Sequence, residues 1–141
     1  MADQARVLAL DYGSARCGCA LSDPTGVLAT PIDTVLAPGT RAGIARLAAL
    51  VTEREVGRVV VGLPLSLSGA DSAQTTETRS FAQRLARRLG PAVPVEVYDE
   101  RFTTRLAQRS GGRASAEDSR AAATLLEGWL AARAGGDGDV G

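Results

Sequence analysis

The sequence of 141 residues contains no histidine and no lysine. The absence of histidine excludes catalytic triads, histidine-based general acid and base chemistry, and histidine metal sites. No apolar run approaches the roughly 18 residues of a membrane-spanning helix, and the first residues lack the basic and apolar segments of a signal peptide. We therefore expect a cytoplasmic protein whose chemistry depends on carboxylates, hydroxyls, arginine or cysteine.

Neither sign of charge is in excess, because the formal net charge is zero. This balance argues against binding nucleic acid through a general basic field. All sixteen basic residues are arginine, whose planar guanidinium suits two-pronged phosphate contacts, although a GC-rich genome gives the same bias. Three of them, Arg84, Arg87 and Arg88, lie on one predicted helix, where they form either a solvated face or a nucleic-acid contact.

Cysteine is scarce, with only Cys17 and Cys19 in the chain. They lie two apart on a predicted strand, so they share a face and are poorly placed to form a disulfide with each other. We interpret them as small strand residues. We expect a monomer or a weak homodimer.

What the sequence does contain is a regular succession of short apolar runs and amphipathic segments. Three short runs separated by tight turns predict an antiparallel meander, with Pro31 indicating an edge strand or an irregular one. Later runs alternate with helical spacing, which predicts two parallel strands joined through helices. The predicted strands are 6–10, 16–21, 27–35, 58–63 and 93–98, and the predicted helices are 41–55, 76–89 and 115–133. The fold class is therefore α/β, with one mixed five-stranded sheet flanked by helices in a domain of residues 1–134, followed by a disordered tail at 135–141.

Three acids are predicted to converge on this sheet. Asp11 and Glu100 each follow a short apolar strand, at the edge where a sheet of this kind forms its sites. Asp118 lies on the core-facing stripe of the last predicted helix, among apolar positions. Carboxylates without histidine or cysteine suit Mg²⁺ or Mn²⁺, and two such ions can activate a water and stabilise the leaving oxygen of a phosphodiester. The sequence therefore predicts metal-assisted phosphodiester hydrolysis.

Each acid also has a purely structural alternative. Asp11 can open a β-turn, and Asp118 matches the acid of a capping box at the start of its helix. Asp99 is adjacent to Glu100, and strand alternation turns only one of the two toward a given side. We favour Glu100 as the metal ligand and keep Asp99 as the alternative.

Polar residues near these acids are candidates for substrate binding. Arg101 can hold a substrate phosphate or pair with a neighbouring acid. Thr103 and Thr104 can cap the segment that follows them or donate to a phosphate. Together with Gly13 and Arg16 beside the first acid, they form the predicted substrate-binding set.

Four motifs then occur in a fixed order along the chain. They are DYGSARCGCALSD at 11–23, VGLPL at 61–65, DERFTT at 99–104 and DSRAA at 118–122. With these motifs the chain resembles the YqgF (RuvX) family over nearly its whole length. The resemblance implies an RNase H-like fold, with Asp11, Glu100 and Asp118 as the catalytic acids that bind Mg²⁺ or Mn²⁺. It also implies a nucleic-acid substrate, either the 5′ end of pre-16S ribosomal RNA or, as the alternative, a Holliday junction.

Two other functions stay open at this point. The turn after Asp11, with Gly18, also fits the first phosphate loop of the sugar kinases and actin, which share the core fold. Those ATPases need two copies of the core, and this chain has room for one. A non-catalytic nucleic-acid-binding module would keep the fold without the activity, although the intact acids argue against it.

Overall fold

The computed structural model describes the backbone of residues 6–64, 72–99 and 114–140, and the side chains of 6–64, 72–99 and 119–133. Strands and helices follow one another in the predicted order. The elements are β1 (Arg6–Asp11), β2 (Arg16–Ser22), β3 (Ala29–Leu36), α1 (Arg41–Glu53), β4 (Val56–Leu63), α2 (Ala73–Leu89), β5 (Val95–Asp99) and α3 (Ala114–Val140). The fold class predicted from the sequence is thereby confirmed.

The five strands form one mixed sheet in the order β3-β2-β1-β4-β5. Strands β1, β2 and β3 make the antiparallel meander, while β4 pairs in parallel with both β1 and β5. β3 lies at the edge of the sheet, and this is the strand that contains Pro31. An edge strand tolerates proline because one side of its backbone has no ladder partner.

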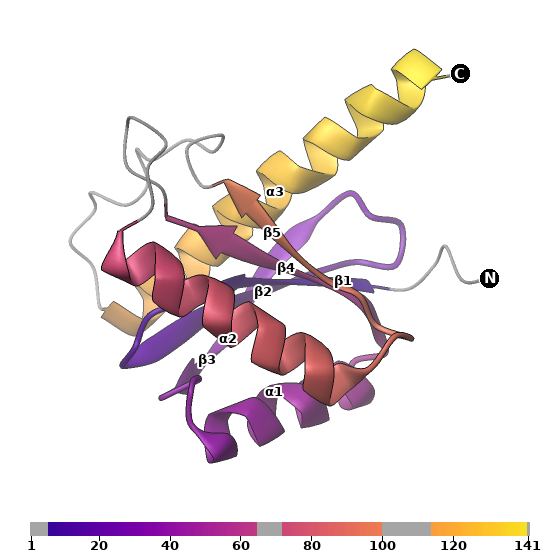
Figure 1. The fold of residues 1–141 in the computed structure, drawn as a ribbon. Coiled ribbons are helices and arrows are strands. Elements are labelled where there is room, and N and C mark those ends of the chain that lie inside the picture. Colours follow the sequence, from indigo (N-terminus) through magenta and orange to yellow (C-terminus); the bar gives the residue numbers. More distant parts are fainter. Residues whose placement is uncertain (1–5, 65–71, 100–113, 141) are drawn as a thin grey trace.

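Helices cover both faces of the sheet, with α1 and α2 on one face and α3 on the other (Figure 1). Strand β4 lies inside the sheet, between β1 and β5, and its residues Val59, Val60 and Val61 are completely buried. Alternate residues of this run enter the two cores, because successive strand side chains point to opposite faces. The continuous β-branched run therefore supplies both cores at once, as the sequence predicted.

Local capping explains where two helices begin and end. The Ser72 side chain accepts a hydrogen bond from the Thr75 backbone N–H, so α2 begins at Ala73, three residues before the predicted start. α1 ends at Glu53, before the predicted residue 55, because Glu55 has a φ of 57° in the left-handed region.

The last helix is longer than predicted. We expected it to end at about Arg133, whereas α3 continues to Val140. The disordered tail expected at 135–141 stays a prediction. An existing helix adds one hydrogen bond for each further residue without repeating the cost of nucleation, and here it extends into glycines of low helix propensity. The boundary of the domain at residue 134 stays a prediction.

Both cysteines are fully buried in the core between the sheet and α1 and α2, and they form no disulfide with each other. This confirms that Cys17 and Cys19 act as small strand residues. Among the described helices, none combines the length and the apolar character that crossing a membrane requires.

Candidate active site

Asp11 closes strand β1 at the edge of the sheet where the parallel strands end. It is half-buried and pairs with Gly18 on the neighbouring strand. β4 ends nearby at Leu63, which pairs with Asp99 at the end of β5. Sheets of this kind form their sites beyond the carboxyl ends of the parallel strands. The structure thus places Asp11 and Asp99 on the predicted edge.

The pleat of the strands decides which face each acid takes. Ala9 and Val60 are paired across β1 and β4, and both lie in the core under α3. Two residues further on, Asp11 takes the same face, and Tyr98 on β5 packs against that same core. Asp99, one residue later, takes the opposite face, toward α1 and α2. Asp11 and Asp99, the described acids at this edge, therefore point to opposite faces of the sheet.

The turn after Asp11 is fixed by α2. Tyr12 is buried, and its ring lies 4.4 Å from that of Phe81, centroid to centroid. Its hydroxyl donates to Oε2 of Glu77 over 2.6 Å, and the Ser14 hydroxyl donates to the same oxygen over 3.0 Å. Gly13 lets the turn close tightly, because a Cβ there would lie only 2.8 Å from the carbonyl oxygen of Arg16.

These contacts also settle the charge at the turn. The hydrogen bonds from Tyr12 and Ser14 lower the pKa of Glu77, so its carboxylate stays ionised. Burial and the hydrogen bond to Glu77 raise the pKa of Tyr12 from its ordinary value of 10 to about 12. The tyrosine is therefore a neutral donor at physiological pH. The negative charge of the Glu77 carboxylate therefore lies against the turn that follows Asp11.

The start of α2 also holds the end of β4. Thr75 is fully buried, and its hydroxyl donates to the carbonyl oxygen of Pro64 over 2.5 Å. One helix thus ties together the ends of two parallel strands, through Glu77 to the turn after β1 and through Thr75 to the residue after β4. This arrangement restrains the geometry of the edge from the α1 and α2 side.

A separate contact holds α3 on the other face. Ser119 is buried, and its hydroxyl donates to the carbonyl oxygen of Ile32 on β3 over 2.5 Å. Ile32 pairs with Cys19, which pairs with Leu10, the residue before Asp11. Neighbouring strands lie about 4.8 Å apart, so this contact fixes the second turn of α3 about 10 Å across the sheet from the end of β1.

The structure describes only some of the predicted site residues. Asp11, Gly13 and Arg16 lie at the described edge. The backbone of residue 118 lies in α3 next to Ser119, and its side chain lies outside the described residues. The predictions that lie entirely outside the described residues concern Glu100, Arg101, Thr103 and Thr104. Within the described part of the chain, no three acidic or cysteine side chains gather as a metal site would need.

Sequence reasoning missed the three residues that hold this edge, Thr75, Glu77 and Ser119. For Thr75 there is a weak signal, since Thr75 and Thr78 share the buried face of α2 with Phe81. Both threonines bond to carbonyl oxygens, Thr75 to that of Pro64 and Thr78 to one within α2. A buried hydroxyl needs such a partner. Glu77 and Ser119 carry no comparable signal, because their partners are distant in the sequence.

Comparison with known proteins gives a consistent answer. A family model described as RuvX, Holliday junction resolvase, matches residues 5–132. A protein of Mycolicibacterium paratuberculosis is 44% identical over 146 residues, covering 94% of this chain and 87% of the relative. A protein of Thermobifida fusca is 45% identical over 139 residues, covering 87% of this chain and 85% of the relative. Both relatives carry the name "Putative pre-16S rRNA nuclease".

Solved structures show the same fold at much lower sequence identity. Thermus thermophilus RuvC in complex with a Holliday junction substrate is similar to this chain with a TM-score of 0.58 and 18% identity. The likeness covers 93% of this chain and 96% of RuvC. At this identity the comparison establishes a shared RNase H-like fold.

Proposed function

The chain belongs to the RuvX family, and on this basis we propose that it is a metal-dependent nuclease that processes the 5′ end of pre-16S ribosomal RNA. The supporting observation from the structure is the position of Asp11. This acid ends the central strand β1 on the face that α3 covers, at the carboxyl edge of the parallel strands. Two relatives that carry the pre-16S nuclease name match most of the chain.

The strand pleat favours Glu100 over Asp99 as the second acid. Tyr98 belongs to the α3 face with Asp11, and Asp99 belongs to the opposite face. If the alternation continued by one residue beyond β5, position 100 would take the α3 face. The third acid, Asp118, is next to Ser119, which anchors α3 to β3 at the same end of the sheet. In our proposal the three acids therefore act together on the face that α3 covers.

The donor chemistry at this edge fits Mg²⁺ or Mn²⁺. Asp11 offers carboxylate oxygens, and the chain has no histidine that would favour a softer transition metal. Asp11, Glu100 and Asp118 would hold the ions, with two ions in our proposal. When bound, such ions supply an activated water and stabilise the leaving oxygen of the phosphodiester. The neighbouring Glu77 is bonded by Tyr12 and Ser14, so its role is to hold the turn that carries Asp11.

The test is the cleavage of an RNA that carries the 5′ extension of pre-16S ribosomal RNA, in Mg²⁺ or Mn²⁺ and in EDTA. We expect Asp11→Asn and Glu100→Gln to reduce cleavage to background, while circular dichroism shows a folded protein. Asp99→Asn is the matched control, because it removes one neighbouring carboxylate on the opposite face. Metal-dependent cleavage by Asp11→Asn at the rate of the unmodified protein would refute the proposal.

Holliday junction resolution is the second candidate, because the family model carries that description and the fold is shared with RuvC. Both substrates present phosphodiesters to the same edge, so a direct comparison is needed. The kcat/KM for the 5′-extended RNA should exceed that for a four-way DNA junction. In the host, depletion of the protein should leave 16S precursors with uncut 5′ extensions. A preference for the junction, with normal 16S maturation, would favour resolution.

A further inference from the structure

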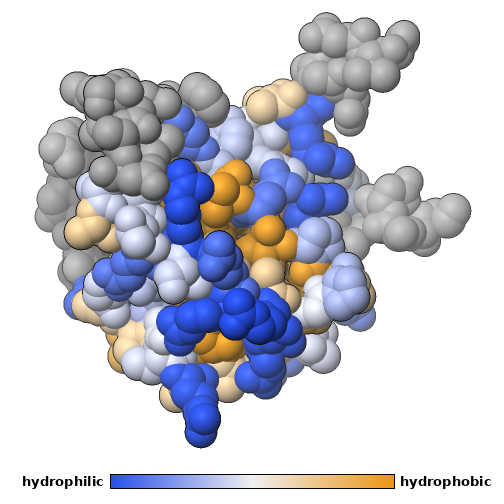
Figure 2. Space-filling model, viewed as in Figure 1, coloured by the Kyte–Doolittle hydropathy of each residue, from blue (hydrophilic) through white to orange (hydrophobic). Residues whose placement is uncertain are grey.

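Four arginines line a single groove between α1 and α2. The groove has a volume of about 570 Å³ and is lined by Arg41, Arg84, Arg87, Arg88 and Ile44. No acidic residue belongs to this lining. Figure 2 shows strongly hydrophilic side chains gathered over α1 and α2 around a small hydrophobic spot. The groove is therefore a local concentration of positive charge on a chain whose net charge is zero.

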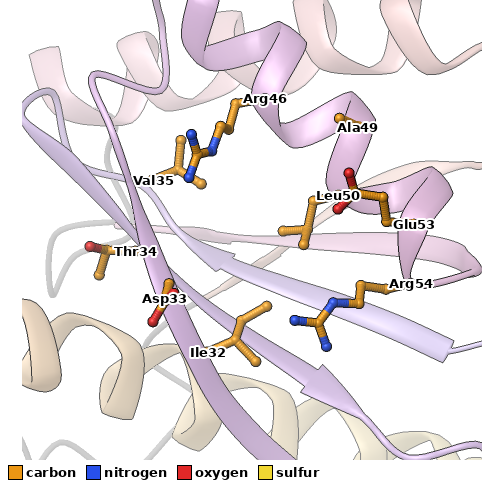
Figure 3. Close-up of a pocket in the computed structure, with 9 residues that line it drawn as sticks. All are labelled: Ile32, Asp33, Thr34, Val35, Arg46, Ala49, Leu50, Glu53 and Arg54. Carbon is orange, nitrogen blue, oxygen red and sulfur yellow. The ribbon is translucent and has the colours of Figure 1, made fainter.

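The composition of the chain does not explain this concentration. A hollow of similar size, about 550 Å³, lies between α1 and β3. Its arginines, Arg46 and Arg54, are accompanied by the acids Asp33 and Glu53 (Figure 3). Charges are balanced there, as on an ordinary solvated surface. The groove between α1 and α2 contains the arginines without the acids.

The arginines of the groove are also available to a ligand. Arg41, Arg87 and Arg88 are exposed. Among the described side chains, Arg58 forms an ion pair with Glu96, whereas these three have no carboxylate partner. Like charges placed close together repel one another, and an anion bound between them would offset that repulsion. The guanidinium of Arg84 donates to the carbonyl oxygen of Gly39, which holds one arginine in place.

The groove continues toward the proposed catalytic edge. Arg84 also lines a second hollow, of about 370 Å³, beside the turn that follows Asp11. This hollow includes Tyr12, Ser14 and the carboxylate of Glu77 to which both hydroxyls donate. A helix rises 1.5 Å per residue, so Glu77 and Arg88 are separated by roughly 16 Å along the axis of α2. Because Asp11 lies on the α3 face, a polyanion bound there would pass around the turn at Tyr12 to the other face before it follows α2 to the arginines.

We propose that this groove binds the phosphodiester backbone of the RNA substrate at a distance from the cleaved bond. The guanidinium fork matches phosphate oxygens in two-pronged geometry, and phosphate contacts position a nucleic acid without reading its sequence. The proposal rests on the nuclease function proposed above. A membrane surface is a poorer match, because Ile44, the apolar residue of the lining, is itself buried.

The experiment measures RNA binding without cleavage. The intact protein is titrated with a fluorescently labelled, 5′-extended pre-16S RNA fragment in EDTA, at salt concentrations from about 50 to 200 mM. The groove variant is Arg87→Gln with Arg88→Gln. The control variant is Arg46→Gln with Arg54→Gln, which removes the same charge from the balanced hollow.

The groove variant should flatten the plot of log affinity against log salt by about 1.4 to 1.8, because each lost phosphate contact changes the slope by about 0.7 to 0.9. The control should keep the slope of the unmodified protein. Arg41→Gln, on the other helix, should flatten the slope by about half as much, which keeps the test valid if the double variant fails to fold.

Equal slopes for the groove and control variants would overturn the inference. Loss of binding to phosphatidylserine vesicles, with unchanged RNA binding, would also overturn it and point to a membrane surface. Cleavage is measured separately in Mg²⁺. If the unmodified protein binds RNA through the arginines and cleaves no RNA, the inference stands and the proposed nuclease function fails.

Discussion

Replacing Ser119 by alanine tests how α3 is held over the proposed catalytic edge. The Ser119 side chain is buried, and its hydroxyl donates to the carbonyl oxygen of Ile32 over 2.5 Å. This hydrogen bond joins residues that are distant in the sequence, and it lies beside the helix position that carries Asp118. The substitution removes one oxygen atom and leaves the apolar packing of α3 unchanged.

The size of the effect follows from two opposing contributions. An acceptor left unsatisfied costs about 1–3 kcal/mol when it is buried, and the lower part of this range applies here because the hydrogen bond is only partly buried. Alanine favours a helix over serine by about 0.5 kcal/mol, which offsets part of this cost. We therefore expect Ser119→Ala to lower the free energy of unfolding by about 1 kcal/mol.

Urea denaturation measures this change, and Thr124→Ala provides the matched control on the same helix. The Thr124 hydroxyl donates to the carbonyl oxygen of Arg120, one turn away in α3, so it holds nothing outside the helix. Its loss should change the free energy of unfolding by less than about 0.5 kcal/mol. If the Ser119 variant is as stable as the Thr124 variant, the contact with Ile32 does not anchor α3. A lower cleavage rate for Ser119→Ala, measured where both variants are folded, would link the anchor to the site.

Two further predictions concern the opposite face of the sheet. Glycine to alanine usually stabilises a helix by about 1 kcal/mol, but Gly43→Ala should destabilise this protein by about 1–3 kcal/mol, because the new Cβ would lie 2.6 Å from Cα of Pro38. A urea midpoint equal to or above that of the unmodified protein would contradict this. The raised pKa of Tyr12 makes the neutral hydroxyl a source of stability that is complete below pH 10 and is lost as the pH rises toward 12. Tyr12→Phe should remove this part of the pH dependence, and an unchanged profile between pH 10 and 12 would exclude Tyr12 as its source.

Most of the fold could be predicted from local patterns in the sequence. The run of Val59 to Val61 has no polar residue, which is typical of a strand buried on both faces, and the structure buries it completely. Pro31 cannot donate a backbone hydrogen bond, which predicts an edge strand or an irregular one, and β3 does lie at the edge of the sheet. Each of these features can be recognised from a single segment of the sequence.

The contacts that hold the site could not be predicted in this way. Glu77 accepts from Tyr12 and Ser14, more than sixty positions earlier, and Ser119 donates to Ile32, 87 positions earlier. Nothing in the local sequence of Glu77 distinguishes it from a solvated helix acid. The end of α3 was missed for a different reason, since helix propensity favours a stop at the glycines that the helix passes through.

The strand pairing in the sheet shows which face Asp99 takes, and this information, which the sequence alone does not give, bears on the choice between Asp99 and Glu100. Alternation alone says that two adjacent acids take opposite faces, and it does not say which face holds the site. Tyr98 packs in the core under α3, as Ala9 does, and Asp11 is two residues beyond Ala9. Because α3 is the helix that carries Asp118, an acid must share the face of Tyr98 to meet both of the others. Asp99 does not satisfy this requirement, whereas position 100 would satisfy it if the alternation continued beyond β5, so the packing of Tyr98 supports the proposal of Glu100 as the second acid.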